Sequence, residues 1–213
     1  MTDYDRKYFE DINRYAPFNY LYPLTRRSNI ASKVVLKIIE TKEDVFASRR
    51  TTQLLKLGIK SSLDVGCANG ELVKKLIDNK IDAYGVDISE YQVNLLNQTM
   101  KGRFILASAV KLPFKNQRFD VVSSFHTLEH IPSKEIPSSL KEMARVSRKY
   151  LVFEFPTEEN FNARIDPTHI SVLSSEEWIK IFTKTLGNEW KFIKLRRSTY
   201  LKPFYVMLQR KLA

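Results

Sequence analysis

The chain has 213 residues, of which 43% are hydrophobic and 28% charged, as expected for one globular domain with an apolar core. No apolar run is long enough to span a bilayer, the charged first residues lack the apolar stretch of a secretion signal, and the single cysteine, Cys67, excludes an internal disulfide. These features predict a cytoplasmic protein without a transmembrane segment, without a cysteine-based zinc site and without any other metal site.

The formal net charge is +11 and the sequence pI is near 9.6. The charged residues are unevenly distributed along the chain. From Lys180 to the end there are nine basic residues and one acidic residue, Glu189. A basic region of this kind favours anionic partners such as nucleic acid, phosphorylated metabolites or a membrane surface. A lysine-rich solvated face without a partner explains the same charge, so both interpretations stay open.

Residues 1–43 are expected to form an aromatic-rich helical cap. A helix is predicted from about Ser28, which would cap it, with three apolar residues along one face: Ile30, Val34 and Ile38. Binding residues concentrate on segments around a rigid scaffold, so this cap is interpreted as a lid; an ordinary packed cap is the alternative. Asp44 is expected to cap a second helix that Gly58 stops.

From there the pattern alternates between apolar strands and amphipathic helices. Strands are predicted at 63–65, 83–86, 104–106, 119–124, 150–155, 190–195 and 204–209. Helices are predicted at 72–77, 91–96, 140–146 and 175–187. Alternating strands and helices imply right-handed crossovers between parallel strands, whereas the last two strands are joined too closely for a crossover. The predicted fold class is therefore α/β: a doubly wound, seven-stranded, mostly parallel sheet with an antiparallel edge hairpin, spanning residues 44–213.

The turn after the first strand is the most informative stretch. Small residues at Gly66, Ala68 and Gly70 allow a sharp strand-to-helix turn that brings the backbone close to a ligand. About twenty residues further on, Asp87 ends the second strand, where a carboxylate can accept both hydroxyl protons of a ribose. The small-residue turn together with Asp87 predicts a nucleoside-binding site. The alternative is a tight bend that serves only packing.

The choice of nucleoside rests on Glu71. It occupies the sixth position of the turn, where the dinucleotide fingerprint has glycine, and an acid there would repel a diphosphate. A phosphate-binding loop ending in Gly-Lys-Ser/Thr is also missing from the sequence. S-adenosylmethionine carries no phosphate, so the sequence predicts this methyl donor as the cofactor.

Five motifs in this order resemble the class I S-adenosylmethionine-dependent methyltransferase family, in particular its small-molecule, methyltransferase type 11-like branch. They are Asp64–Gly70, Tyr84–Ser89, Ala107–Phe114, Phe119–Val122 with Leu128–Ile131, and Asp166–Ile170, and the likeness extends from about Thr51 to Lys184. The resemblance implies a Rossmann-like methyltransferase fold. It also implies a set of cofactor-binding residues: Asp64, Gly66, Cys67, Ala68, Asn69, Gly70, Asp87, Ile88, Ser108, Ala109, Phe125 and His126.

Two positions depart from the family pattern. Ala68 replaces the usual middle glycine, which is expected to be a mild change because both residues are small. Ser108 stands where family members commonly have an aspartate that accepts a hydrogen bond from the adenine amino group. An uncharged acceptor is weaker, so a lower cofactor affinity is expected.

Methyl transfer from a sulfonium needs positioning above all, and a base only for a weakly acidic target. His126 and His169 are the predicted catalytic residues, because histidine titrates near neutrality and both follow the ends of central strands. The predicted acceptor contacts are Tyr20, Tyr22, His130, Asp166 and His169. For each histidine a structural, hydrogen-bonded role is the alternative, and for His130 it is favoured. Glu154 is expected to be a buried partner for a nearby donor.

The sequence after the fourth strand narrows the acceptor. Ser123–His126 differs from the Asn/Asp-Pro-Pro-aromatic motif of enzymes that methylate exocyclic base amino groups, and the sole cysteine lies in the cofactor turn rather than at a nucleophile position. The prediction is therefore methyl transfer to an oxygen, nitrogen or carbon atom of a small metabolite, anionic metabolites included. An RNA- or protein-directed methyltransferase that docks through the basic carboxyl-terminal region is one alternative, and a non-catalytic cofactor-binding scaffold is another.

Overall fold

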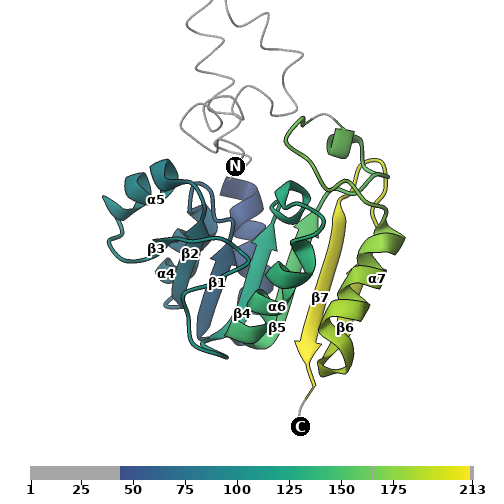
Figure 1. Cartoon of the computed structure of the whole chain (residues 1–213). Coiled ribbons are helices and arrows are strands. Elements are labelled where there is room, and N and C mark those ends of the chain that lie inside the picture. The colour runs from purple at the N-terminus through teal and green to yellow at the C-terminus, as the bar shows by residue number, and fades with distance from the viewer. Residues whose placement is uncertain (1–43, 165, 212–213) are drawn as a thin grey trace, which may run out of the picture.

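A seven-stranded sheet with the strand order β3-β2-β1-β4-β5-β7-β6 forms the centre of the molecule (Figure 1). The computed structural model describes residues 44–164 and 166–211. The strands are β1 Ser61–Val65, β2 Asp82–Asp87, β3 Phe104–Leu106, β4 Phe119–Phe125, β5 Ser147–Phe155, β6 Trp190–Arg196 and β7 Phe204–Arg210. The first five pair in parallel, and β7 runs antiparallel to both β5 and β6. The predicted doubly wound sheet with an antiparallel edge hairpin is confirmed.

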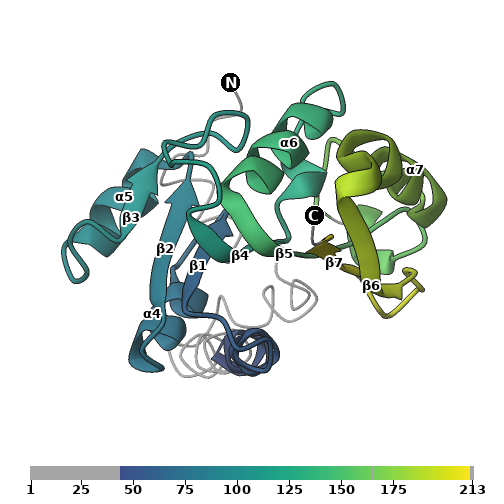
Figure 2. The ribbon, with the colours of Figure 1, turned by 90° about the horizontal axis from the view of Figure 1, so that it is seen from below.

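Helices cover both faces of the sheet (Figure 2). Residues 44–55 are helical, and the later α-helices are α4 Glu71–Asp78, α5 Glu90–Asn97, α6 Ile136–Val146 and α7 Ser175–Leu186. Within the described residues, short 3-10 helices follow β4, β5 and α7, respectively: η1 Leu128–His130, η2 Phe161–Arg164 and η3 Gly187–Glu189. In the part of the chain that the structure describes, no helix combines the length and the apolar character that crossing a membrane requires.

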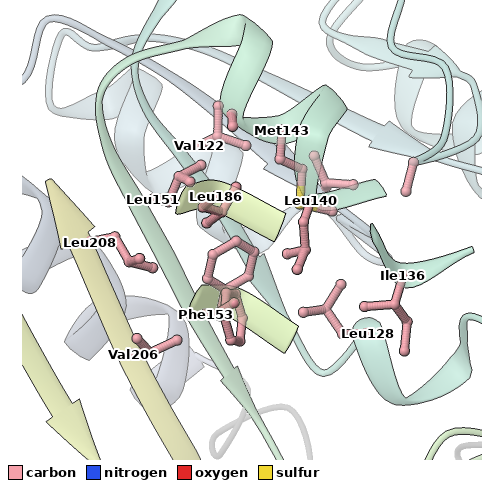
Figure 3. Packing of buried hydrophobic residues seen from close by; sticks show 14 of the residues in the cluster. Val122, Leu128, Ile136, Leu140, Met143, Leu151, Phe153, Leu186, Val206 and Leu208 are labelled. Atoms are coloured by element: carbon pink, nitrogen blue, oxygen red, sulfur yellow. The ribbon is translucent and has the colours of Figure 1, made fainter. Parts of the chain in front are cut away.

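Two hydrophobic cores result, one on each face. The larger core lies between the sheet and helices α6 and α7, where Leu140, Met143 and Leu186 pack on Val122 and Phe153 (Figure 3). The second core joins the helix at 44–55, α4 and α5 to the opposite face. Strands β1 and β4 are buried along their whole length, as expected for parallel strands that are covered on both faces. This rigid centre holds the carboxyl ends of β1, β2, β4 and β5 at one edge of the sheet.

Several predicted boundaries need correction. Asp44 is not an N-cap: it is already helical, and its carboxylate pairs with the Lys75 ammonium at 2.6 Å. Helix α6 begins four residues earlier than expected, with Pro137 in its first turn, where proline is tolerated. Helix α7, in contrast, begins at Ser175 as predicted, and Ser174 before it forms a capping box with Glu177. The predicted cap at 1–43, including the helix from Ser28, lies outside the described residues.

Candidate active site

The turn between β1 and α4 is held in a left-handed conformation. Gly66, Ala68 and Gly70 have φ angles of 78°, 41° and 71°. The amides of Gly66 and Cys67 both donate to the Val86 carbonyl of β2, at 2.8 and 3.1 Å. A Cβ atom on Gly66 would lie 2.1 Å from the Thr127 hydroxyl oxygen, so only glycine fits there. At Ala68 the unfavourable feature is the backbone angle rather than the size of the side chain. A left-handed φ costs a non-glycine residue about 1–2 kcal/mol. The substitution is therefore less mild than its size suggests.

Asp87 connects the end of β2 to this turn. One oxygen of its carboxylate, Oδ2, accepts a hydrogen bond from the Ala68 amide at 2.9 Å, and Oδ1 accepts from the Ser89 amide at 2.9 Å. Burial raises the pKa of Asp87, and these backbone donors act in the opposite direction. Each carboxylate oxygen can accept more than one hydrogen bond, so both retain capacity for a hydroxyl donor. The arrangement suits a ribose diol.

Asp64 lies at the end of β1, beside Asp87. Burial raises the pKa of Asp64 to about 7, although Ser123 donates to its Oδ1 at 2.8 Å and the Arg50 guanidinium favours the charged form. The nearby Asp87 charge adds to the rise. Asp64 therefore carries a proton much of the time at neutral pH, and its hydrogen bond to Ser123 ties β1 to β4.

The predicted cofactor residues fall into three groups in the structure. Cys67, Ala109 and Phe125 have side chains in the hydrophobic cores, so any ligand contact would come mainly from their backbone. Asn69 accepts a hydrogen bond from the Glu71 amide at 3.2 Å, and the Ser108 hydroxyl accepts from the Val110 amide at 3.4 Å. These two therefore stabilise turns. Ile88 is half-exposed and follows Asp87 directly, where an apolar surface suits a purine ring.

Glu71 disfavours a diphosphate less strongly than its charge alone suggests, because that charge is paired. The Glu71 carboxylate pairs with the Lys74 ammonium at 2.9 Å, and both side chains are about a third exposed. A charge that is paired and solvated repels a nearby phosphate less than an isolated one. The choice between a dinucleotide and S-adenosylmethionine therefore depends more on the motif set than on this one acid.

All three histidines of the chain gather around Glu129. The carboxylate oxygen Oε1 of Glu129 lies 3.4 Å from His126 Nδ1 and 4.0 Å from His169 Nε2. The rings of His130 and His169 meet edge to face with centroids 4.8 Å apart. Glu129 is fully buried, and among the described residues neither of its carboxylate oxygens has a hydrogen-bond partner.

Backbone contacts bring these side chains together from two loops. Residues Ile170 and Ser171, after β5, donate their amides to the Glu129 carbonyl at 3.0 and 2.9 Å. Thr168 Oγ1 and its carbonyl lie 3.0 and 3.2 Å from His130 Nδ1. Burial lowers the pKa of His130, whereas the Glu129 charge acts against that shift. The hydrogen-bonded role considered for His130 is thus present in the structure.

Comparisons with known proteins agree with this geometry. Residues 63–153 match the family model described as a methyltransferase domain. The chain is 33% identical over 94 residues to 27-O-demethylrifamycin SV methyltransferase of Amycolatopsis mediterranei, covering 40% of this chain and 34% of that protein. It is 26% identical over 102 residues to sterol 4-C-methyltransferase of Caenorhabditis elegans, covering 43% and 30%. This part of the chain therefore matches a methyltransferase domain, in agreement with the motifs that resemble the class I S-adenosylmethionine-dependent methyltransferases.

The fold comparison extends over more of the chain. Magnesium protoporphyrin IX methyltransferase from Synechocystis, with bound SAH, superposes with a TM-score of 0.66 at 17% identity, covering 98% of this chain and 97% of that one. At this identity the likeness shows a common fold and nothing about the acceptor. The chain spans about a third of the length of the curated relatives named above.

The structure places the other predicted site residues as follows. Half-exposed His126 follows β4 with a φ of 53°, and its amide donates to the Glu154 carbonyl at 2.8 Å. The Asp166 carboxylate accepts from the Thr168 amide and hydroxyl at 2.9 and 2.6 Å, so it stabilises the loop that carries His169. Tyr20 and Tyr22 lie outside the described residues.

Glu129 is the residue that the sequence analysis missed. The motif pattern assigns it no role of its own, yet it is the acid around which the three histidines of this chain gather. A signal was available: Glu129 stands three residues after His126 and directly before His130, in the stretch richest in histidine. Its contact with His169, forty residues away, could not be seen in the sequence.

The expected partner role of Glu154 is confirmed. Its carboxylate pairs with the Arg50 guanidinium at 3.3 Å through one oxygen and with the Arg196 guanidinium at 3.2 Å through the other. The Arg50 guanidinium also stacks over the Phe125 ring, 4.3 Å from its centroid. Two cations therefore share one anion next to the carboxyl end of β4.

Proposed function

We propose that this protein transfers a methyl group from S-adenosylmethionine to an oxygen, nitrogen or carbon atom of a small metabolite, anionic metabolites included. The observation that carries the proposal is the hydrogen bonding of Asp87. Its carboxylate is fixed by the Ala68 and Ser89 amides at the mouth of a left-handed turn, within a methyltransferase domain. The acceptor chemistry of the relatives varies from a rifamycin to a sterol, so the acceptor is argued from this chain's own residues.

The residues present fit the methyl donor. Asp87 would accept the ribose hydroxyls, the backbone of 66–70 would line the methionine part, and Ile88 with the backbone near Ser108 would contact adenine. When bound, the donor supplies a sulfonium-activated methyl carbon. The protein's own work is to hold the acceptor in line with that carbon and to exclude water.

His126 is the residue best placed to take a proton from the acceptor. It is half-exposed at the end of β4, and its Nδ1 lies 3.4 Å from the buried Glu129 carboxylate, which would stabilise the imidazolium once the proton has moved. His126 would take the proton of an acceptor hydroxyl, or the proton that an acceptor ammonium must lose before its nitrogen has a free electron pair. His169 is mostly buried and its Nδ1 lies 3.1 Å from the Ala163 carbonyl, so we assign it to positioning around Glu129.

An anionic acceptor is favoured by the charges beside this site. Arg50 and Arg196 share the single carboxylate of Glu154, which leaves a net positive charge near Phe125. A carboxylate or phosphate on the acceptor would complete this arrangement, because guanidinium groups bind such anions with two parallel hydrogen bonds. We also propose that residues 1–43 act as a lid and that Tyr20 and Tyr22 contact the acceptor.

Docking of RNA or protein through the basic carboxyl-terminal region is less well supported. Two of its cations each have an acid to themselves: Arg197 pairs with Glu176 at 2.6 Å, and Arg210 pairs with Glu189 at 2.9 Å. Paired cations offer less charge to phosphates than the sequence count suggests.

Calorimetry with S-adenosylmethionine and its demethylated product tests the cofactor assignment. The Asp87→Asn substitution removes the charge but keeps the shape, and we expect it to weaken binding at least about tenfold. Asp78→Asn, an exposed acid on α4, is the matched control and should bind normally. Incubation with labelled methyl donor and fractionated cell extract then shows whether label enters metabolites, RNA or protein. Binding of a dinucleotide without binding of either ligand would refute the proposal.

A further inference from the structure

The cluster around Glu129 carries an inference that goes beyond methyl transfer. One ligand atom from each of Glu129, His130 and His169 lies within 4.8 Å of the other two. We propose that these three side chains bind a divalent transition-metal cation. The sequence alone predicted no metal site, because His169 is brought to the other two residues only by the fold.

The Glu129 carboxylate is the strongest sign of a missing ligand. It has no exposed surface, and across the ranges 44–164 and 166–211 neither oxygen accepts a hydrogen bond. A buried carboxylate is normally paired, hydrogen-bonded or bound to a metal, because leaving its charge unsatisfied is costly. Among the described residues, the groups that face it are His126, His130 and His169, and the Asp166 carboxylate lies 3.8 Å from His169 Nε2. None of these is a fixed cation.

The two histidines are oriented as metal ligands usually are. His169 Nδ1 lies 3.1 Å from the Ala163 carbonyl, and His130 Nδ1 lies 3.2 Å from the Thr168 carbonyl. A carbonyl oxygen only accepts hydrogen bonds, so both contacts favour the tautomer with hydrogen on Nδ1 and the lone pair on Nε2. A metal-binding histidine commonly donates its second N–H to a carbonyl in this way, which fixes the ring.

The donor set selects the class of cation. Two imidazole nitrogens and one carboxylate suit first-row transition metals such as Zn²⁺, Co²⁺ or Fe²⁺, whereas Mg²⁺ and Ca²⁺ prefer oxygen ligands. Metal–ligand distances of about 2.1 Å would draw the three side chains together by about 1 Å relative to the present separation. Three protein ligands leave at least one coordination position open. That this position takes an oxygen of the acceptor rests on the proposed function; binding of the cation does not.

Titration of the 213-residue chain, without an affinity tag, with Co²⁺ alone tests the site. The chain has only three histidines and one cysteine, so a visible cobalt–imidazole spectrum has few possible sources. We expect one ion per chain, displaced by Zn²⁺. The substitutions Glu129→Gln and His169→Gln should each weaken Co²⁺ binding at least about tenfold, since even residues behind the ligands contribute that much. Asp78→Asn, an exposed acid on α4 away from the cluster, should change the affinity by less than about threefold.

Circular dichroism and S-adenosylmethionine binding check that each variant is folded. If Glu129→Gln fails to fold, His169→Gln decides the question. Wild-type protein that binds no Co²⁺, or folded Glu129 and His169 variants that bind it as wild type does, would overturn the inference and identify the cluster as a structural hydrogen-bonded group. Loss of S-adenosylmethionine binding in the Asp87→Asn variant leaves Co²⁺ binding intact, so the two proposals can fail separately.

Discussion

The buried carboxyl of Asp64 makes the stability of this protein depend on pH in a predictable direction. Its folded-state pKa is about 7, against an ordinary value of 3.8 for the unfolded chain, and the main cause is burial. Between these two values the folded chain binds more protons than the unfolded chain, so this carboxyl makes the folded state lose stability as the pH rises towards 7 and adds no further change above that. Proton linkage from pH 5 to pH 8 gives a loss of about 2.5 kcal/mol.

Urea unfolding of wild type and Asp64→Asn at pH 5 and pH 8 measures this contribution. The asparagine variant keeps the shape and cannot ionise, so the difference in unfolding free energy between the two proteins should shift by about 2.5 kcal/mol in favour of the variant at pH 8. Ser123→Ala is a second probe, because it removes the hydroxyl that favours the charged form and should enlarge the shift. Parallel pH profiles for wild type and Asp64→Asn would refute the reasoning.

Three further predictions concern the turn and the arginine pair. Gly66→Ala should destabilise the fold by more than about 2 kcal/mol in urea, whereas Gly102→Ala, with a similar φ of 76° and no described atom within 4 Å of the added Cβ, should cost about 1–2 kcal/mol; equal costs would contradict the clash with Thr127. Ala68→Gly should be neutral or raise the Tm, and a clear fall would show that the angle is not strained. Glu154→Gln should lower the unfolding free energy by about 1–3 kcal/mol, and an unchanged urea midpoint would show that the pairing with both arginines contributes nothing.

The fold could be predicted because its signals are local. The central strands β1, β2 and β4 coincide with short apolar runs that are largely buried, whereas β6 is mostly exposed. The short link between β6 and β7 dictates an antiparallel pair. The errors lie where tertiary contacts override local preference. Asp44 resembles a cap in the sequence, but its carboxylate is attracted to Lys75 on the neighbouring helix. Helix α6 extends back over Pro137, which a sequence reader treats as a helix breaker.

In the site too, the parts that could be predicted are those formed by residues close together in the sequence. The cofactor turn and Asp87 lie within one strand–helix–strand unit. Their separation along the chain is therefore enough to predict that they are close together in the fold. Ala68 was judged by size, whereas the turn also imposes a left-handed φ. The histidine cluster depends on two loops after different strands, joined by the Ile170 and Ser171 amides that donate to the Glu129 carbonyl. Such a contact leaves no periodic pattern in the sequence.

A single side chain couples the cofactor turn to this cluster. The Thr127 hydroxyl donates to the Val65 carbonyl at 3.3 Å and occupies the space that a side chain on Gly66 would fill. Thr127 also precedes η1, and its carbonyl accepts from the His130 amide at 3.0 Å. The position of η1, and with it the Glu129 carboxylate, is therefore set by how closely Thr127 approaches the turn. Glycine at position 66 is thus required by both the cofactor turn and the histidine cluster. It allows the left-handed φ of the turn, and it leaves room for Thr127, which precedes the segment with Glu129.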